Sequence, residues 1–155
     1  MNVDNDKHID ELMEAFQQFA RMSWRKTTLW GLKPSEIRVL VSIQKGMKKD
    51  GGKGRTVSDL SKQLKVTSPT VTQMVNSLIA QGYAVRTPDS QDRRISDITL
   101  TDKGSELAGM AVAKARETFQ GMIDHLGKER SEALRELLNE VYGYFDSLNS
   151  RENDF

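Results

Sequence analysis

The chain has 155 residues, a length that suits one domain with a sizeable core. Leu, Ile, Val and Phe number 14, 7, 10 and 5, which lies just above the roughly 20% level below which disorder is expected, so the chain should fold. The net charge is only +1. Without cysteine the chain has no disulfides and no thiolate metal site. No apolar run is long enough to span a bilayer, and the polar N-terminus is not a secretion signal. We therefore expect a soluble, cytoplasmic protein.

The N-terminal third predicts two helices. Apolar residues recur at three- and four-residue steps over 9–20, with acidic and amide side chains between them, as in an amphipathic helix that ends near Trp30. Pro34 suits the first turn of a second, shorter helix that runs up to Gly46. We expect Lys45–Arg55 to form a loop rich in glycine and lysine.

Two further helices should follow across a tight break. Thr56-Val57-Ser58-Asp59 has the spacing of a capping box and predicts a helix of two or three turns. After a break at 65–66, Thr67 or Ser68 can cap a fourth helix, and Pro69 fits its first turn. Apolar residues occupy one face of this helix and small polar residues the other. The apolar face comprises Val71, Met74, Val75, Leu78 and Ile79.

The C-terminal half predicts a hairpin and two long helices. Tyr83–Thr87 and Ile95–Leu100 read as two strands around a tip rich in turn residues. Thr101 can cap a helix of about six turns that Gly127 stops, and a last helix follows. The apolar stripes of the first and last two helices exceed what a domain of about seventy residues can cover, which favours a partner subunit. Packing of these helices on each other within one chain is the alternative.

The charges are unevenly distributed. Residues 45–94 carry ten Lys and Arg against four Asp, whereas residues 95–155 carry seven basic and twelve acidic side chains. A basic middle beside an acidic end is typical of a polyanion-binding module on a separate scaffold. A solvated loop that happens to be rich in lysine is the alternative.

The order of these elements is that of a winged helix-turn-helix, a mainly α fold of the α+β class. Its second short helix would show small polar groups to base edges in the major groove, where Gln or Asn suits adenine. An ordinary polar helix face is the alternative. Arginines at the hairpin tip favour DNA, because an arginine there reaches phosphates or a narrow minor groove. The candidate contacts are Thr70, Thr72, Gln73 and Asn76 on the helix and Arg86, Arg93 and Arg94 in the hairpin.

Five motifs, in order and spacing, resemble the MarR (multiple antibiotic resistance) regulators from about residue 9 to 148. They are Leu32–Leu40, Thr56–Leu60, Ser68–Val75, Asp92-Arg93-Arg94 and Leu100-Thr101-Asp102-Lys103-Gly104. The resemblance implies a winged helix-turn-helix with long N- and C-terminal dimerisation helices, acting as an obligate homodimer on a pseudo-palindrome in double-stranded DNA. It also implies a cleft that accepts a small aromatic or anionic effector, which releases the DNA.

The resemblance also implies roles for individual residues, according to their positions in these motifs. Ser68, Pro69, Thr70 and Gln73 lie where members of the family read bases, and in the Asp92–Arg94 motif the carboxylate steadies the hairpin while an arginine enters the minor groove. Gln73 stands where many relatives have arginine, which favours adenine over guanine. Lys65 replaces a usual glycine, which suggests a phosphate contact in a slightly strained turn. The 45–55 loop is longer than is typical and either touches the flanking DNA backbone or is a solvated tether.

The resulting division of the chain is a single intertwined domain with three parts. Residues 1–32 form an N-terminal dimerisation helix, residues 33–100 the winged helix-turn-helix lobe and residues 101–155 the C-terminal dimerisation helices. Four large residues near the first helix are candidates for an effector pocket, with core or dimer packing as the alternative. They are Phe19, Met22, Trp24 and Trp30.

No pattern in the sequence predicts an enzyme, a cofactor or a metal site. Gly51–Arg55 lacks the spacing of a phosphate-binding loop, and no nucleophile is paired with a base. Asp4, Asp6, His8 and Asp10 could collect a metal, but a frayed polar terminus is favoured. We predict a sequence-specific transcriptional regulator, a repressor, released by an effector. The alternative is a helical protein-interaction scaffold with incidental, unselective DNA binding.

Overall fold

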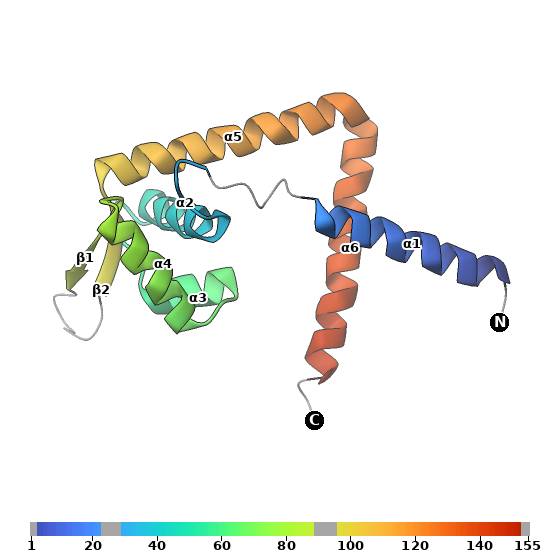
Figure 1. Cartoon of the computed structure of the whole chain (residues 1–155), viewed down its shortest axis with the longest axis horizontal. Coiled ribbons are helices and arrows are strands. Elements are labelled where there is room, and N and C mark those ends of the chain that lie inside the picture. Colours follow the sequence, from blue (N-terminus) through green and yellow to red (C-terminus); the bar gives the residue numbers. More distant parts are fainter. Residues whose placement is uncertain (1–2, 23–28, 89–95, 153–155) are drawn as a thin grey trace. The chain divides into compact units, whose positions relative to one another are not determined.

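The computed structural model describes residues 3–22, 29–88 and 96–152, and these form six helices and a two-stranded antiparallel sheet (Figure 1). The predicted mainly helical winged helix-turn-helix is confirmed. The chain divides into two compact units, Met1–Ala108 and Gly109–Phe155. In chain order the elements are α1 (Val3–Arg21), α2 (Pro34–Lys49), α3 (Val57–Leu64), α4 (Ser68–Ala80), β1 (Ala84–Pro88), β2 (Ser96–Leu100), α5 (Asp102–Leu126) and α6 (Lys128–Glu152).

A single hydrophobic core joins α2, α3, α4 and the hairpin in the first unit. Leu40 and Ile43 of α2 and Leu60 of α3 are fully buried in it. The predicted apolar face of α4 is confirmed, because Val71, Val75 and Leu78 are fully buried and Met74 and Ile79 are partly buried against them. Since one face of α4 is fixed to this core, its opposite face is held at the surface.

The hairpin has the predicted antiparallel pairing, with Ala84 opposite Leu100 and Pro88 opposite Ser96. Along β2, Ile98 and Leu100 are buried and Thr99 between them is less so, because successive side chains of a strand point to opposite faces. The loop after α2 adds a single bridge to β2, in which Arg55 and Ile98 exchange backbone hydrogen bonds of 2.9 and 2.8 Å. A Cβ at Gly54 would lie 2.6 Å from the Ile98 carbonyl oxygen, so this close approach requires glycine.

The ends of the first two helices differ from the prediction. α1 extends over Val3–Arg21, so its N-terminal residues are helical rather than frayed and it does not reach Trp30. α2 continues past Gly46 to Lys49, so the first part of the expected 45–55 loop is helical. The reason lies in tertiary packing: a Cβ at Gly46 would overlap the Arg55 side chain, so this glycine provides space inside a helix instead of ending it.

The first of the two C-terminal helices begins and ends as predicted. The Thr101 hydroxyl accepts a hydrogen bond from the Gly104 N–H at 3.0 Å and thereby caps α5, while Gly127, with φ +81°, ends it. The amide of Gln44 in α2 donates to the Ser105 carbonyl at 2.8 Å, which joins the core of the lobe to the first turn of α5. Among the described residues, no helix is both long and apolar enough to span a bilayer.

Candidate nucleic-acid interface

Thr67 fixes the start of α4. Its hydroxyl oxygen accepts from the Thr70 N–H at 3.4 Å and lies 2.8 Å from the Thr70 hydroxyl. Of the two predicted caps, Thr67 is therefore the one used, and Ser68 becomes the first helical residue with its side chain exposed. Pro69 in this first turn removes no hydrogen bond, because the amide it lacks has no partner at a helix start.

The face of α4 opposite the core carries the predicted polar residues. Ser68, Pro69, Gln73 and Asn76 are exposed, whereas the two threonines between them are half-buried. Thr70 already shares a hydrogen bond with Thr67, so it is oriented before any partner binds. α4 therefore presents short donors and acceptors on a rigid support, as a helix that reads base edges must.

Arg86 of β1 holds Asn76 of α4. The Arg86 guanidinium donates to the Asn76 side-chain oxygen at 3.0 Å. A guanidinium carries donors only, so the amide oxygen of Asn76 must face it and the amide nitrogen is directed elsewhere. A bidentate contact with adenine needs both atoms of the amide. The Asn76 oxygen keeps a second lone pair for such a contact, so adenine stays the prediction for Asn76, with Arg86 sharing that oxygen.

Lys65 forms the turn between α3 and α4. Its backbone is left-handed, with φ 53° and ψ 47°, and its N–H donates to the Ser61 carbonyl. The turn is closed by the Ser61 hydroxyl, which donates to the Val66 carbonyl at 2.6 Å. The predicted strain at this position is confirmed, since a residue with a Cβ is disfavoured in this conformation. The Lys65 side chain is exposed beside the start of α4.

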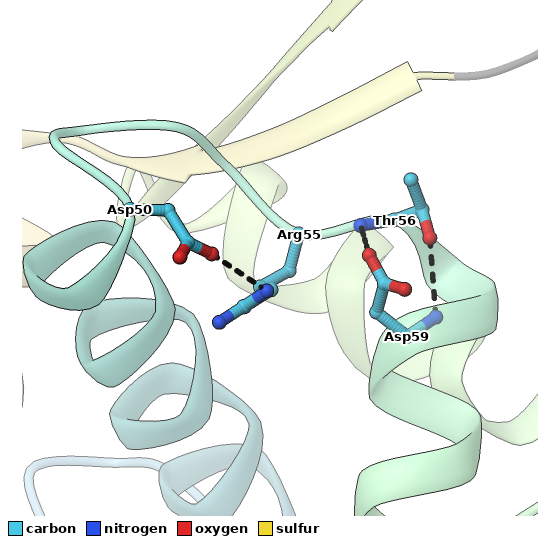
Figure 2. Close-up of polar contacts among 4 residues, drawn as sticks. All are labelled: Asp50, Arg55, Thr56 and Asp59. Carbon is cyan, nitrogen blue, oxygen red and sulfur yellow. Dashed lines mark hydrogen bonds and ion pairs between the residues drawn. The ribbon is translucent and has the colours of Figure 1, made fainter.

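The predicted capping box at the start of α3 is confirmed (Figure 2). The Thr56 N–H donates to the Asp59 carboxylate and the Asp59 N–H donates to the Thr56 hydroxyl, both at 3.1 Å. The hydrogen bond from the Thr56 N–H, with smaller contributions from the Thr56 hydroxyl and nearby Arg55 and Lys62, holds the pKa of Asp59 below its ordinary value. Asp59 therefore stays charged, and its carboxylate is bound at the start of α3.

Sequence reasoning missed a groove between α2 and α3. Its volume is about 540 Å³, and Figure 2 shows Arg55 reaching from the loop into the space between the two helices. Arg55 forms a 3.0 Å ion pair with Asp50 at the end of α2. The only signal in the sequence was the excess of basic residues over 45–94. It did not indicate that α2 would extend far enough to form one side of this groove. The lining residues are Lys45, Gly46, Lys49, Arg55, Asp59, Lys62 and Gln63.

Comparison with known proteins points to one family. Residues 30–95, which include α2, α3, α4 and β1, match the sequence model of the MarR family. Over these residues the chain is similar to the MarR-family winged-helix transcription factors. This match supports the resemblance found in the sequence motifs.

Two curated relatives and one solved structure illustrate the similarity. The HTH-type transcriptional regulator FarR of Neisseria gonorrhoeae is 30% identical over 92 residues, 59% of this chain and 63% of the relative. The repressor MdtR of Bacillus subtilis is 33% identical over 91 residues, 56% of this chain and 55% of the relative. The chain thus aligns with less than two thirds of either relative's length. Streptococcus pneumoniae FabT in complex with DNA has the same fold, with a TM-score of 0.67, 23% identity and coverage of 94% of this chain and 97% of FabT.

The remaining predicted site residues divide into two groups. Asp92, Arg93, Arg94 and Trp24 lie outside the described residues. Phe19, Met22 and Trp30 are 59, 52 and 39% exposed, so the alternative that they pack in the core of one chain is wrong. Effector binding or dimer packing stays a prediction for these three. Among the described residues no cluster of His, Asp or Glu has the arrangement of a metal site.

Proposed function

We propose that this chain is a cytoplasmic, sequence-specific repressor of the MarR family that binds a pseudo-palindromic operator as a homodimer. The observation that carries the proposal is α4, which buries Val71, Val75 and Leu78 in the core while Gln73 and Asn76 on its opposite face are exposed. Such a helix can enter the major groove without moving relative to its core. The hairpin that follows α4 would contact the adjacent backbone or minor groove through Arg93 and Arg94, with Asp92 steadying the hairpin.

The homodimer is supported by the apolar residues that α1, α5 and α6 leave exposed. Leu12 and Phe16 of α1, Phe119 of α5 and Leu137 and Phe145 of α6 are each about half exposed, which is costly for large apolar side chains repeated along one helix. Two copies related by a twofold axis would cover these faces together. The two recognition helices would then read half-sites with centres about 10–10.5 bp apart.

Effector release forms the second part of the proposal. A small aromatic or anionic ligand near Phe19, Met22 and Trp30 would lower DNA affinity only by favouring a dimer geometry in which the recognition helices have the wrong separation. This part fails if no compound changes the affinity of the protein for its operator. The function needs no catalysis, cofactor or metal.

Selection from a random duplex pool, followed by competition with unrelated duplex, tests the DNA-binding proposal. We expect a palindromic preference and a log affinity that falls with log salt at a slope near −7, because about eight phosphates are contacted by the dimer. A slope shallower than about −2 would contradict the proposal. Stoichiometric complexes with another protein, together with unselective duplex binding, would instead support a helical interaction scaffold.

A further inference from the structure

The groove between α2 and α3 has a strong excess of positive charge. Its lining includes four cationic side chains, Lys45 and Lys49 of α2, Arg55 of the loop and Lys62 of α3, against the single carboxylate of Asp59. The groove lies on α2, α3 and their connection, and none of the residues predicted to read bases from α4 lines it. It is therefore a separate cationic surface on the same lobe.

The carboxylates nearby form no direct ion pair with the lysines of the groove. Asp59 is bound to the Thr56 N–H within the capping box, and Asp50 is paired with Arg55 at 3.0 Å. Among the residues that the structure describes, no ion pair involves Lys45, Lys49 or Lys62. The pKa of Asp59 is lowered by the hydrogen bond from the Thr56 N–H and in part by nearby Arg55 and Lys62, and this single carboxylate leaves the groove with an excess of positive charge.

A bound anion would relieve the repulsion within this arrangement. Lys45 and Lys49 are four residues apart on α2, a spacing at which like charges repel across one helical turn. The Arg55 Nε lies buried beside Gly46 with no acceptor in the described part of the chain. Lysines at the end of a helix also complement its dipole, which accounts for Lys48 and Lys49 in the last turn of α2 and for Lys62 in the last turn of α3, but not for Lys45.

We propose that this groove binds a phosphate group, held by Lys45, Lys49 and Lys62 with Arg55 as the fixed cation behind them. Flexible lysines suit phosphate as point charges that can adjust around one anion. The phosphate has two possible sources, the backbone of DNA flanking the operator or a free phosphate-bearing small molecule. The first source rests on the proposed function and extends the DNA contact beyond α4 and the hairpin, whereas the second does not depend on it.

The test compares two double variants of the full-length chain. Lys45→Gln/Lys49→Gln removes two charges that line the groove, whereas Lys48→Gln/Lys53→Gln removes two exposed charges from the same segment that do not line it. Thermal unfolding in chloride alone first establishes that both variants fold. The two proteins then differ in the position of the lost charge and not in its amount.

The first measurement is affinity for a long duplex across a range of salt concentrations. If DNA supplies the phosphate, the groove variant loses about tenfold in affinity and its log–log salt slope becomes shallower by about 2 for the dimer, because about one phosphate contact per subunit is lost. The control variant should change by no more than about twofold. A loss confined to long duplexes and absent on a minimal operator would place the contact on flanking DNA.

The second measurement is the shift in unfolding temperature caused by millimolar inorganic phosphate, compared with chloride of equal ionic strength. If a free phosphate compound is the source, phosphate stabilises the wild type and the control variant but not the groove variant. This result supports the groove site even if the chain shows no selective DNA binding, which separates it from a failure of the proposed function. Equal behaviour of the two double variants in both measurements overturns the proposal.

Discussion

The lobe formed by α2, α3, α4 and the hairpin buries its apolar residues, whereas α1, α5 and α6 expose theirs. Ile43 of α2 is 0% exposed and Leu137 of α6 is 58% exposed, although both lie in amphipathic helices with similar spacing. The difference is the presence of covering elements: the core that contains Ile43 also includes residues of α3, α4 and the hairpin. Periodicity therefore identifies the face of a helix that needs a partner, but not whether that partner is in the same chain.

The largest predicted effect comes from breaking the proposed interface. Leu137→Lys should convert the dimer to a monomer and lower affinity for a palindromic operator by at least about 100-fold, because two linked half-sites gain about 10²–10⁴ in avidity. Sedimentation and duplex binding measure both quantities. Asn139→Lys, which adds the same charge at an exposed polar position on α6, is the control. A Leu137→Lys monomer with full operator affinity would refute the dimer.

The second prediction concerns the buried side of the comparison. Ile43→Ala should lower the free energy of unfolding by about 2–5 kcal/mol, since it removes a fully buried side chain and leaves a cavity. Urea unfolding monitored by circular dichroism provides the measurement. Lys48→Ala, on the exposed side of the same helix, should change the unfolding free energy by less than about 0.5 kcal/mol. Similar values for the two variants would contradict the assignment of the core.

A smaller effect is expected at the contact between the hairpin and α4. Arg86→Ala should free the Asn76 oxygen and shift the preference at one base pair toward adenine, by about 1–3 kcal/mol in discrimination. Selection from a random duplex pool detects such a shift in base preference. Loss of a phosphate contact would not cause this shift, because losing such a contact weakens binding to all sequences alike. The shift should vanish in Asn76→Ala/Arg86→Ala. Its persistence in that double variant would mean that Arg86 acts independently of Asn76.

The smallest predicted effect is at the turn before α4, where stability and binding should change in opposite directions. Lys65→Gly should raise the free energy of unfolding by about 0.5–1 kcal/mol, because φ is +53° there, and should weaken binding to all duplexes a few-fold if Lys65 contacts a phosphate. Thermal unfolding and binding to two unrelated duplexes measure the two effects. Lys65→Asn, which tolerates the same backbone conformation without a charge, should weaken binding equally. A lower unfolding temperature in Lys65→Gly would refute the strain.

Local signals predicted most of the elements. The capping box at Thr56, the helix break at 65–66 and the cap at Thr101 depend on hydrogen bonds or backbone angles within a few residues, and all three are present. The apolar face of α4 was predictable for the same reason, since a period of 3.6 residues places its members on one side. The positions of the α4 residues that we propose to face DNA follow from that face.

The sequence by itself thus determined the helices, their caps and the face of each that requires burial, because these depend on neighbours along the chain. Only the tertiary structure decided that α2 continues through Gly46, that Arg55 bridges to Ile98 and that Arg86 holds Asn76. Each of these features joins residues that are separated along the chain and meet only when the lobe folds. Gly46 shows the reason most clearly: its local signal predicts a helix end, but packing against Arg55 favours a helix in which one position has no side chain.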